Sequence, residues 1–283
     1  MNLMQYPRPE YSISHFARPQ SWELDGRELD LMMDDGWDVR LRFAGRKVSF
    51  FSEALIAPVG PFDYFCFKAD DTTFFVSFEV RREENHIYVL DLAQRLVTRL
   101  VCERGGHPKS PYILDRRTTF GAVRLPGYRL PWKRHSFTSA HFGTAVQWRW
   151  SPKLVTKHAY LESDWYRITW DDSGEAADDF DVYMETLPSN DEKAQYVKIK
   201  DDMILFSVTE EMQERIFGDS QHFRNNNLTL LQNYDRMFQV GRGYGEVVLP
   251  DGALRHINIP LCAYGTPPEL PEGFLTAKNP FTV

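Results

Sequence analysis

The chain has 283 residues, of which 14% are aromatic and 26% are charged. This length suits two domains of about 130 residues, each large enough to bury a core of its own. With 33 basic and 40 acidic residues, the formal net charge is −7 and no basic stripe occurs. This balance disfavours nucleic acid and anionic membrane surfaces as partners.

The predicted elements are almost all strands. Aromatic and β-branched residues recur with a period of two in six runs, and glycine- and aspartate-rich turns separate them. This arrangement is typical of meandering antiparallel strands, which form up-and-down barrels or strongly curved sheets. The predicted strands cover residues 48–51, 62–68, 74–81, 87–92, 180–186 and 203–209, and turns are expected at 34–36, 44–46, 171–174 and 250–252.

Several short segments of the sequence resemble later segments, and these pairs, which we call echoes, keep the same order along the chain. This predicts two diverged copies of one β-rich unit, with chance likeness of short strand fragments as the alternative. We expect an N-terminal barrel over residues 1–152 and a C-terminal barrel over 153–283. Loop insertions are expected near residues 105–117 and 218–227. The paired segments are 37–43 with 165–170, 70–77 with 201–207, 92–97 with 233–238, and 120–127 with 244–251.

Three segments resemble the molybdenum cofactor biosynthesis protein F (MoaF-like) family. They are Asp35-Gly36-Trp37 before an alternating strand, residues 165–169 at the start of the second copy, and the glycine-rich residues 239–245. The likeness covers roughly residues 20–262 and implies an all-β fold of two tandem lipocalin-like, or calycin, antiparallel β-barrels. No pterin-, molybdate- or nucleotide-binding motif accompanies it, so the fold and not the family's name is carried over.

Residues 35–41 are also similar to the Asn-Gly-Trp strand opening of phenolic acid decarboxylases. Those enzymes are small lipocalin-like barrels that act without a metal or an organic cofactor. The likeness implies chemistry by tyrosine, arginine and glutamate side chains that project into the barrel. The family's Tyr-Arg pair on the next strand is missing from residues 48–53, which puts decarboxylation itself in doubt.

A barrel of about eight strands either fills its interior with side chains or holds one small ligand. Glu53 and Glu79 lie on neighbouring predicted strands, and burial would raise the pKa of a carboxyl there into the range of a general acid or base. The alternative is that both glutamates face water. Tyr64 and His86 complete the predicted catalytic set, because tyrosine and histidine also transfer protons.

The predicted ligand-binding residues surround that set. Arg40 and Arg42 share a strand face and would clamp a carboxylate or phenolate, unless that face is solvated. Aromatic walls suit an aromatic or polyketide-like ligand, although aromatic side chains also fill cores. The other ligand-binding candidates are Trp37, Phe51, Phe75 and Tyr88, and the second copy offers Tyr183, Glu185 and His222.

Stronger chemical motifs are absent from the sequence. It contains no HExxH, Walker or GxSxG motif, and Gly241–Gly245 lacks the strand-turn-helix context of a dinucleotide loop. Cys66, Cys102 and Cys262 are odd in number and form no CxxC pair, which argues against a disulfide framework and a structural zinc site. We expect no metal and no cofactor, although a metal held by scattered ligands stays open.

Two classes of function remain. The first is a cofactor-independent isomerase, lyase or cyclase that acts on a small aromatic or polyketide-like metabolite inside a barrel. The second is a non-catalytic carrier or sensor of the lipocalin type, and a purely structural tandem is a third. The first copy is richer in Phe and Arg, which favours an enzyme with its site in that barrel.

The expected partner is a small apolar or aromatic ligand, with neither nucleic acid nor a membrane, and a homodimer stays open. No signal peptide and no apolar run of about 18 residues occurs, so we expect a cytoplasmic protein.

Overall fold

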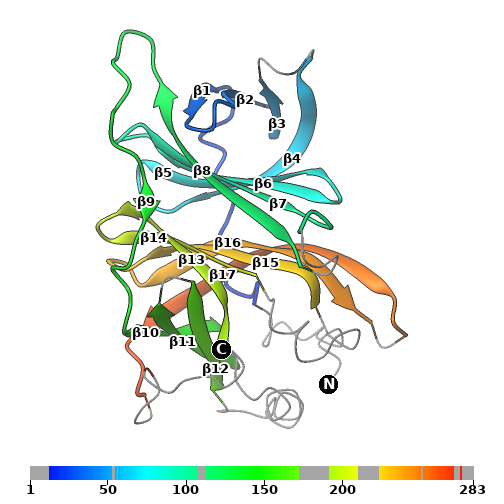
Figure 1. The fold of residues 1–283 in the computed structure, drawn as a ribbon, viewed down its shortest axis with the longest axis vertical. Coiled ribbons are helices and arrows are strands. Elements are labelled where there is room, and N and C mark those ends of the chain that lie inside the picture. The colour runs from blue at the N-terminus through cyan, green and yellow to red at the C-terminus, as the bar shows by residue number, and fades with distance from the viewer. Residues whose placement is uncertain are drawn as a thin grey trace. The chain divides into compact units, whose positions relative to one another are not determined.

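The computed structural model describes residues 13–52, 55, 57–107, 113–162, 164–171, 191–209, 223–249, 251–270 and 275. Within these residues the regular elements are β-strands, and no helix occurs. The strands form two closed eight-stranded antiparallel barrels, which confirms the predicted all-β tandem-barrel fold (Figure 1). The first barrel consists of β1–β8 and the second of β10–β17.

The first barrel is a simple meander in which each strand pairs with the next and β8 returns to β1. Closure is direct, because Met33 of β1 pairs with Gly121 of β8. Its strands are β1 (Glu28–Met33), β2 (Val39–Ala44), β3 (Lys47–Phe51), β4 (Val59–Lys68), β5 (Thr73–Arg81), β6 (Glu84–Asp91), β7 (Leu96–Glu103) and β8 (Asp115–Arg124).

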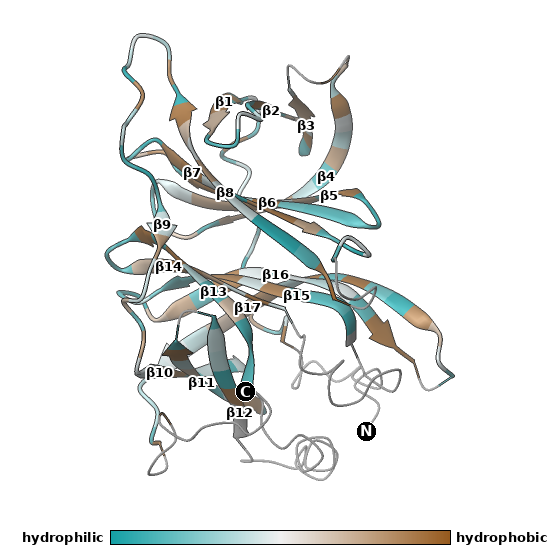
Figure 2. Cartoon of the chain, in the orientation of Figure 1, coloured by the Kyte–Doolittle hydropathy of each residue, from teal (hydrophilic) through white to brown (hydrophobic). Residues whose placement is uncertain are grey.

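Alternation of side chains explains why these segments form a barrel wall. On β2, Val39, Leu41 and Phe43 are buried whereas Arg40 and Arg42 are exposed, as expected for a strand with one face on the core. Hydrophobic and hydrophilic bands follow one another along β4 in the same way (Figure 2).

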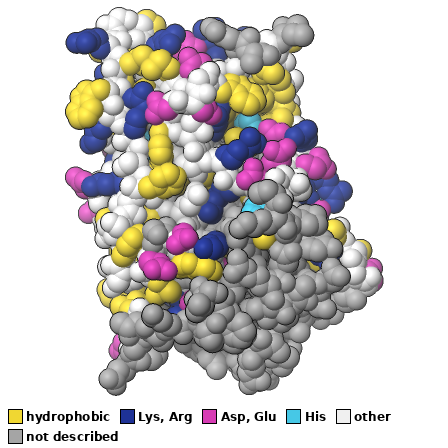
Figure 3. Space-filling view, viewed as in Figure 1, with side chains coloured by type: hydrophobic (Ala, Val, Ile, Leu, Met, Phe, Trp, Pro, Cys, Tyr) yellow, Lys and Arg dark blue, Asp and Glu magenta, His cyan; other side chains and the backbone are white. Residues whose placement is uncertain are grey.

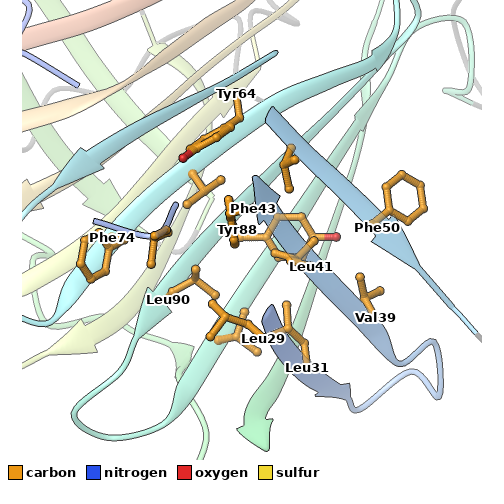
Figure 4. Close-up of a cluster of buried hydrophobic side chains, with 14 of the residues drawn as sticks. Leu29, Leu31, Val39, Leu41, Phe43, Phe50, Tyr64, Phe74, Tyr88 and Leu90 are labelled. Atoms are coloured by element: carbon orange, nitrogen blue, oxygen red, sulfur yellow. The ribbon is translucent and has the colours of Figure 1, made fainter. Parts of the chain in front are cut away.

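The core of the first barrel collects the inward side chains of its strands (Figure 4). Within this core, the Tyr64 ring makes edge-on contacts with two other rings. Its centroid lies 5.1 Å from that of Phe43 and 5.6 Å from that of Trp22. Such aromatic pairs add to the free energy of area burial alone. Inward residues therefore have even numbers on β4, β5 and β6, where Tyr64, Phe78 and Tyr88 belong to the core.

The second barrel has the same cyclic order, with β10 paired to β17 and β12 paired to β13 to close it. Closure here includes the buried ion pair of Arg167 on β12 with its cross-strand partner Asp191 on β13. Its strands are β10 (Thr144–Ser151), β11 (Leu154–Glu162), β12 (Trp165–Asp171), β13 (Asp191–Lys200), β14 (Met203–Thr209), β15 (Phe223–Asn233), β16 (Phe238–Val248) and β17 (Leu254–Thr266).

The division of the chain differs from the expected boundary at residue 152. That position lies in the turn between β10 and β11, which are paired strands of the same barrel. The two compact units instead divide between Ser136 and Phe137, within the two-residue strand β9, and residues 13–17 belong to the C-terminal unit. Residues 148–153, where the sequence pattern breaks, form the end of β10 and its turn into β11 and not a boundary between barrels.

Two of the predicted echoes occupy equivalent places in the barrels. Residues 70–77 and 201–207 both run from the turn before the fifth strand into that strand. Residues 92–97 and 233–238 both form the turn between the sixth and seventh strands. The correspondence extends to the backbone, because the Arg95 and Met237 carbonyls accept hydrogen bonds from the last strand of each barrel and both residues have positive φ, 58° and 46°.

The other two echoes fall on strands that are not equivalent. Residues 37–43 lead into the second strand of the first barrel, whereas 165–170 lie on the third strand of the second. Residues 120–124 lie on the last strand of the first barrel, whereas 244–248 lie on the strand before the last in the second. These similarities reflect the alternation and glycine content that many strands share, so only the middle of the repeat aligns by structure.

The described surface carries charges of both signs in close alternation. Figure 3 shows Lys and Arg side chains interspersed with Asp and Glu over the described part of one face. Many of them form ion pairs across neighbouring strands, as Arg40 does with Asp30 and Lys47 with Asp63. Among the described residues, none belongs to a helix that is long and apolar enough to cross a membrane.

Candidate functional site

A polar group of side chains lies inside the first barrel on the hairpin of β6 and β7. Tyr88 pairs with Arg99 across the two strands, and the next inward residue toward the β5–β6 turn is His86, opposite Val101. Tyr88 and Val97 belong to the core cluster, so the face that carries His86, Tyr88 and Arg99 points inward. All three side chains are at most 6% exposed.

His86 forms a dyad with Glu84, its inward neighbour two residues earlier on β6. The His86 Nε2 atom lies 2.7 Å from Glu84 Oε1, and the Glu84 side chain is 21% exposed. The hydrogen bond from His86 holds the pKa of Glu84 below its ordinary value, so this carboxyl is ionised near neutral pH. An ionised acceptor fixes the hydrogen on Nε2 and leaves Nδ1 as the free acceptor of the ring.

Nδ1 of His86 is buried and has no hydrogen-bond partner among the described residues. Burial lowers the pKa of His86, and the contact with Glu84 offsets part of that effect. The ring is therefore neutral near pH 7, with a lone pair directed into the barrel. A neutral imidazole held by a carboxylate is the arrangement of a general base.

Tyr88 and Arg99 place hydrogen-bond donors beside this base. Burial raises the pKa of Tyr88 to about 12, against a smaller opposing effect of Arg99, so the hydroxyl keeps its proton. The Tyr88 hydroxyl and the Arg99 guanidinium interact with each other, although neither the hydroxyl nor Arg99 Nε has a partner of ordinary hydrogen-bond geometry within the described part of the chain. In Figure 4 the Tyr88 hydroxyl points toward the side where Phe50 lies.

The turn between β1 and β2 holds the Arg99 guanidinium in place. Its Nη2 atom forms an ion pair with Asp35, and its Nη1 atom donates to the Trp37 carbonyl at 3.4 Å. The guanidinium carbon also lies 5.6 Å from the centroid of the Trp37 ring, within cation–π range. Asp35 and Trp37 thus fix the cation while its Nε–H remains available.

Aromatic rings line the same part of the interior. The rings of Phe62 and Phe78 are stacked at 5.9 Å, and those of Phe78 and Tyr88 are stacked at 5.8 Å. Phe50 completes this wall, with its centroid 5.5 Å from that of His86. A planar ligand can stack on such walls while its polar end meets the base and the donors.

The structure brings together only some of the predicted site residues. His86 and Tyr88 are neighbours on one inward face, and Trp37 joins them through Arg99. Tyr64 also faces the interior, but its hydroxyl points toward Phe74 in Figure 4, away from the side of Phe50. Burial raises the pKa of Tyr64 to about 12, so this hydroxyl is a donor and not a base.

Five other predicted residues lie on the outward face of the barrel wall. Arg40 and Arg42 are exposed and pair with Asp30 and Glu28. Inward alternation on β3 and β5 runs through Phe50, Phe74, Val76 and Phe78, so the residues between them point out of the barrel interior. This corrects the predicted inward placement of Phe51, Phe75 and Glu79, of which Phe75 packs on the neighbouring outward ring of Phe67.

Four candidates lie outside the described residues, namely Glu53, Tyr183, Glu185 and His222.

Sequence reasoning missed Glu84 and Arg99, which supply the orienting carboxylate and the cation. A signal for Arg99 was present, because the turn at Leu92–Arg95 sets the register of a hairpin that pairs Tyr88 with Arg99. Period-two alternation would likewise have placed Glu84 on the inward face of His86.

Across the described ranges, no cluster of three or more His, Cys, Asp or Glu side chains is arranged to hold a metal ion. The sequence matches no known protein-family model, and it has no significant match among curated proteins.

Proposed function

We propose that the first barrel is a cofactor-independent proton-transfer enzyme, an isomerase or lyase, for a small aromatic or polyketide-like metabolite. The observation that carries the proposal is the neutral His86, bound to Glu84 through Nε2, whose unpartnered Nδ1 shares the interior with Tyr88 and Arg99. Buried polar atoms usually have partners, so the unpartnered Nδ1 of His86 favours a ligand that supplies one.

The proposed reaction begins with proton abstraction. His86 Nδ1 takes a proton from a carbon next to the carbonyl of the ligand, and the electron pair of the broken C–H bond moves to the carbonyl oxygen. The Tyr88 hydroxyl and the Arg99 guanidinium stabilise the negative oxygen, and Glu84 stabilises the imidazolium. Return of the proton to a different carbon gives an isomer, whereas expulsion of a leaving group from the β-carbon gives a lyase reaction.

The expected contributions of these groups differ in size. A positioned general base typically accelerates a reaction about 10²–10⁴-fold. One donor to a developing oxyanion contributes about 10²–10³-fold in a site that excludes water. His86 and the Tyr88–Arg99 pair are therefore each expected to be necessary for measurable turnover.

A suitable probe is 4-hydroxyphenylpyruvate, which has a planar ring, a carboxylate and an enolisable carbon. Exchange of its C3 hydrogens for deuterium in D₂O, followed by proton NMR, reports proton abstraction without knowledge of the natural substrate. We expect His86→Phe to lower the exchange rate at saturating probe at least about 100-fold. Arg99→Met is also expected to lower the exchange rate at saturating probe, about 10²–10³-fold, because it removes a donor to the developing oxyanion.

Arg42→Ala is the matched control, because it removes a guanidinium from the outward face of the same barrel. Its exchange rate should equal that of the unchanged protein. Exchange that is insensitive to His86→Phe would overturn the proposed base. Saturable binding of the probe without exchange would instead favour a carrier.

The proposal also includes a cytoplasmic location and a relationship to the MoaF-like family. The three cysteines are odd in number and form no CxxC pair, which supports a reducing cytoplasmic location. Relationship to the MoaF-like family is supported only by the tandem-barrel architecture.

A further inference from the structure

The interior of the second barrel contains a histidine enclosed by aromatic rings. His158 on β11 lies between Leu154 and Tyr160, which alternate with it on the inward face and belong to the core cluster. Its ring centroid is 5.4 Å from that of Tyr166 and 6.1 Å from that of Phe206. The three strands β11, β12 and β14 therefore converge on one imidazole.

Both ring nitrogens of His158 are buried and lack a hydrogen-bond partner among the residues that the structure describes. The side chain is 3% exposed, so bulk water does not reach it freely. A neutral imidazole always presents one N–H donor and one lone pair, and leaving both unpaired in an apolar interior is costly. Burial lowers the pKa of His158 to about 3, so the ring stays neutral near pH 7 and both nitrogens still need hydrogen-bond partners.

Two polar side chains of the same interior are engaged with other groups. Trp150 Nε1 donates to Thr156 Oγ1 at 2.8 Å, and the Tyr196 hydroxyl donates to the Trp165 carbonyl at 2.9 Å. The cation on the neighbouring strand, Arg167, lies on the outward face and is paired with Asp191. The ring contacts of His158 are with the uncharged aromatic side chains of Trp150, Tyr166 and Phe206.

We propose that the second barrel binds a neutral, planar aromatic molecule that carries a hydrogen-bonding group, with His158 as its polar anchor. The two ring nitrogens point away from each other, so one small ligand bonds one of them, either by accepting from the imidazole N–H or by donating to the lone pair. Tyr166, Phe206 and Trp150 contact the ring of the ligand. Aromatic amides, lactams and hydroxyketones have this chemistry. The site is separate from the proposed base in the first barrel and does not depend on it.

Benzamide is a suitable probe, because its carbonyl can accept from the imidazole N–H and its amide N–H can donate to the imidazole lone pair. The full chain, labelled with ¹⁵N at histidine, is titrated with benzamide and followed through the imidazole ¹⁵N resonances. We expect a saturable shift of one of the two His158 nitrogen signals, which reports one new hydrogen bond. Ethylbenzene, which has the ring without the polar groups, is expected to leave the hydrogen-bonding state of these nitrogens unchanged.

The matched variant is His158→Phe, which keeps an aromatic ring of similar size and removes both nitrogens. Calorimetry should show benzamide affinity reduced at least tenfold in this variant, with ethylbenzene affinity equal or higher. Equal benzamide affinity in the two proteins overturns the proposal. Absence of saturable binding to the folded unchanged protein also overturns it and assigns the unpaired nitrogens to buried water. If the variant does not fold, the ¹⁵N titration of the unchanged protein decides alone.

Discussion

The two barrels share one cyclic strand order but differ in what their walls carry. Alignment of the β6–β7 hairpin with β15–β16 places Leu228 and Leu230 where the first barrel has His86 and Tyr88. Gly241 then stands at the position of Arg99, because it pairs with Leu230 as Arg99 pairs with Tyr88. The polar groups of the proposed site are therefore properties of the first barrel alone.

The second barrel places its unpaired polar group on a different strand. His158 belongs to β11, the counterpart of β2, whose inward residues Val39, Leu41 and Phe43 are all apolar. The same barrel architecture can thus carry polar, reactive side chains on different strands. The difference shows that barrel closure constrains size and alternation, whereas the site depends on a few inward side chains.

The largest expected effect concerns Gly241. A Cβ atom there would lie 1.8 Å from the Thr229 carbonyl oxygen, so the backbone itself would have to shift. We expect Gly241→Ala to destabilise the second barrel by about 4 kcal/mol or more, measured by urea unfolding with hydrogen exchange on β15–β17. Gly243→Ala is the control, because its Cβ meets only side-chain methyl groups at 3.2–3.7 Å. Equal effects of the two changes would contradict this interpretation.

The third and fourth strands of the two barrels give the next contrast. Arg167 and Asp191 pair across β12 and β13 with side chains only 10% and 3% exposed, whereas Lys47 and Asp63 pair across β3 and β4 with 44% and 85% exposed. We expect Asp191→Ala to cost about 3 kcal/mol of unfolding free energy, because it removes the carboxylate partner of a buried cation. Asp63→Ala should cost less than about 1 kcal/mol in the same urea titration. Similar costs would remove the distinction between the two ion pairs.

Acid should destabilise the second barrel through His158. Burial lowers its pKa from 6.5 to about 3, so as pH falls the unfolded chain binds the proton first. The stabilisation is complete above about pH 6.5 and is lost progressively toward pH 3, with about 2 kcal/mol gone by pH 5. Urea midpoints against pH, read from exchange of the second-barrel amides, measure this slope.

His158→Phe should reduce that slope to the part that His141 contributes, because burial lowers the pKa of His141 to about 4 in the same unit. His86→Phe should leave the slope unchanged because His86 belongs to the first barrel. A slope that survives His158→Phe would assign the acid sensitivity to other groups.

The smallest expected effect compares two buried tyrosines on corresponding strands. The Tyr196 hydroxyl on β13 donates to the Trp165 carbonyl at 2.9 Å, whereas the Tyr64 hydroxyl on β4 has no partner among the described residues. We expect Tyr196→Phe to cost about 1 kcal/mol and Tyr64→Phe to be neutral or slightly stabilising in thermal unfolding. A larger cost for Tyr64→Phe would indicate that its hydroxyl has a partner in solution.

The residues on the outward faces of β2 and β5 show when sequence alternation reveals the inward face of a strand and when it does not. On β2 the apolar residues alternate with arginines, so the sequence alone could have placed Arg40 and Arg42 on the solvent face. On β5 every residue from Thr73 to Phe78 is buried, so alternation cannot tell the inward face from the outward one. The placement of Phe75 and Glu79 therefore required the tertiary structure.

The sequence by itself determined the all-β class, the tandem of barrels and the turns between strands, because these follow from period-two alternation and local turn residues. It also named His86 and Tyr88 as candidate site residues. The local turn fixes which residues of β6 and β7 face each other, but only the tertiary structure decided which face of that hairpin points inward and that His158 is enclosed by aromatic rings. These contacts depend on which face a closed barrel turns inward, and local pattern does not encode that choice.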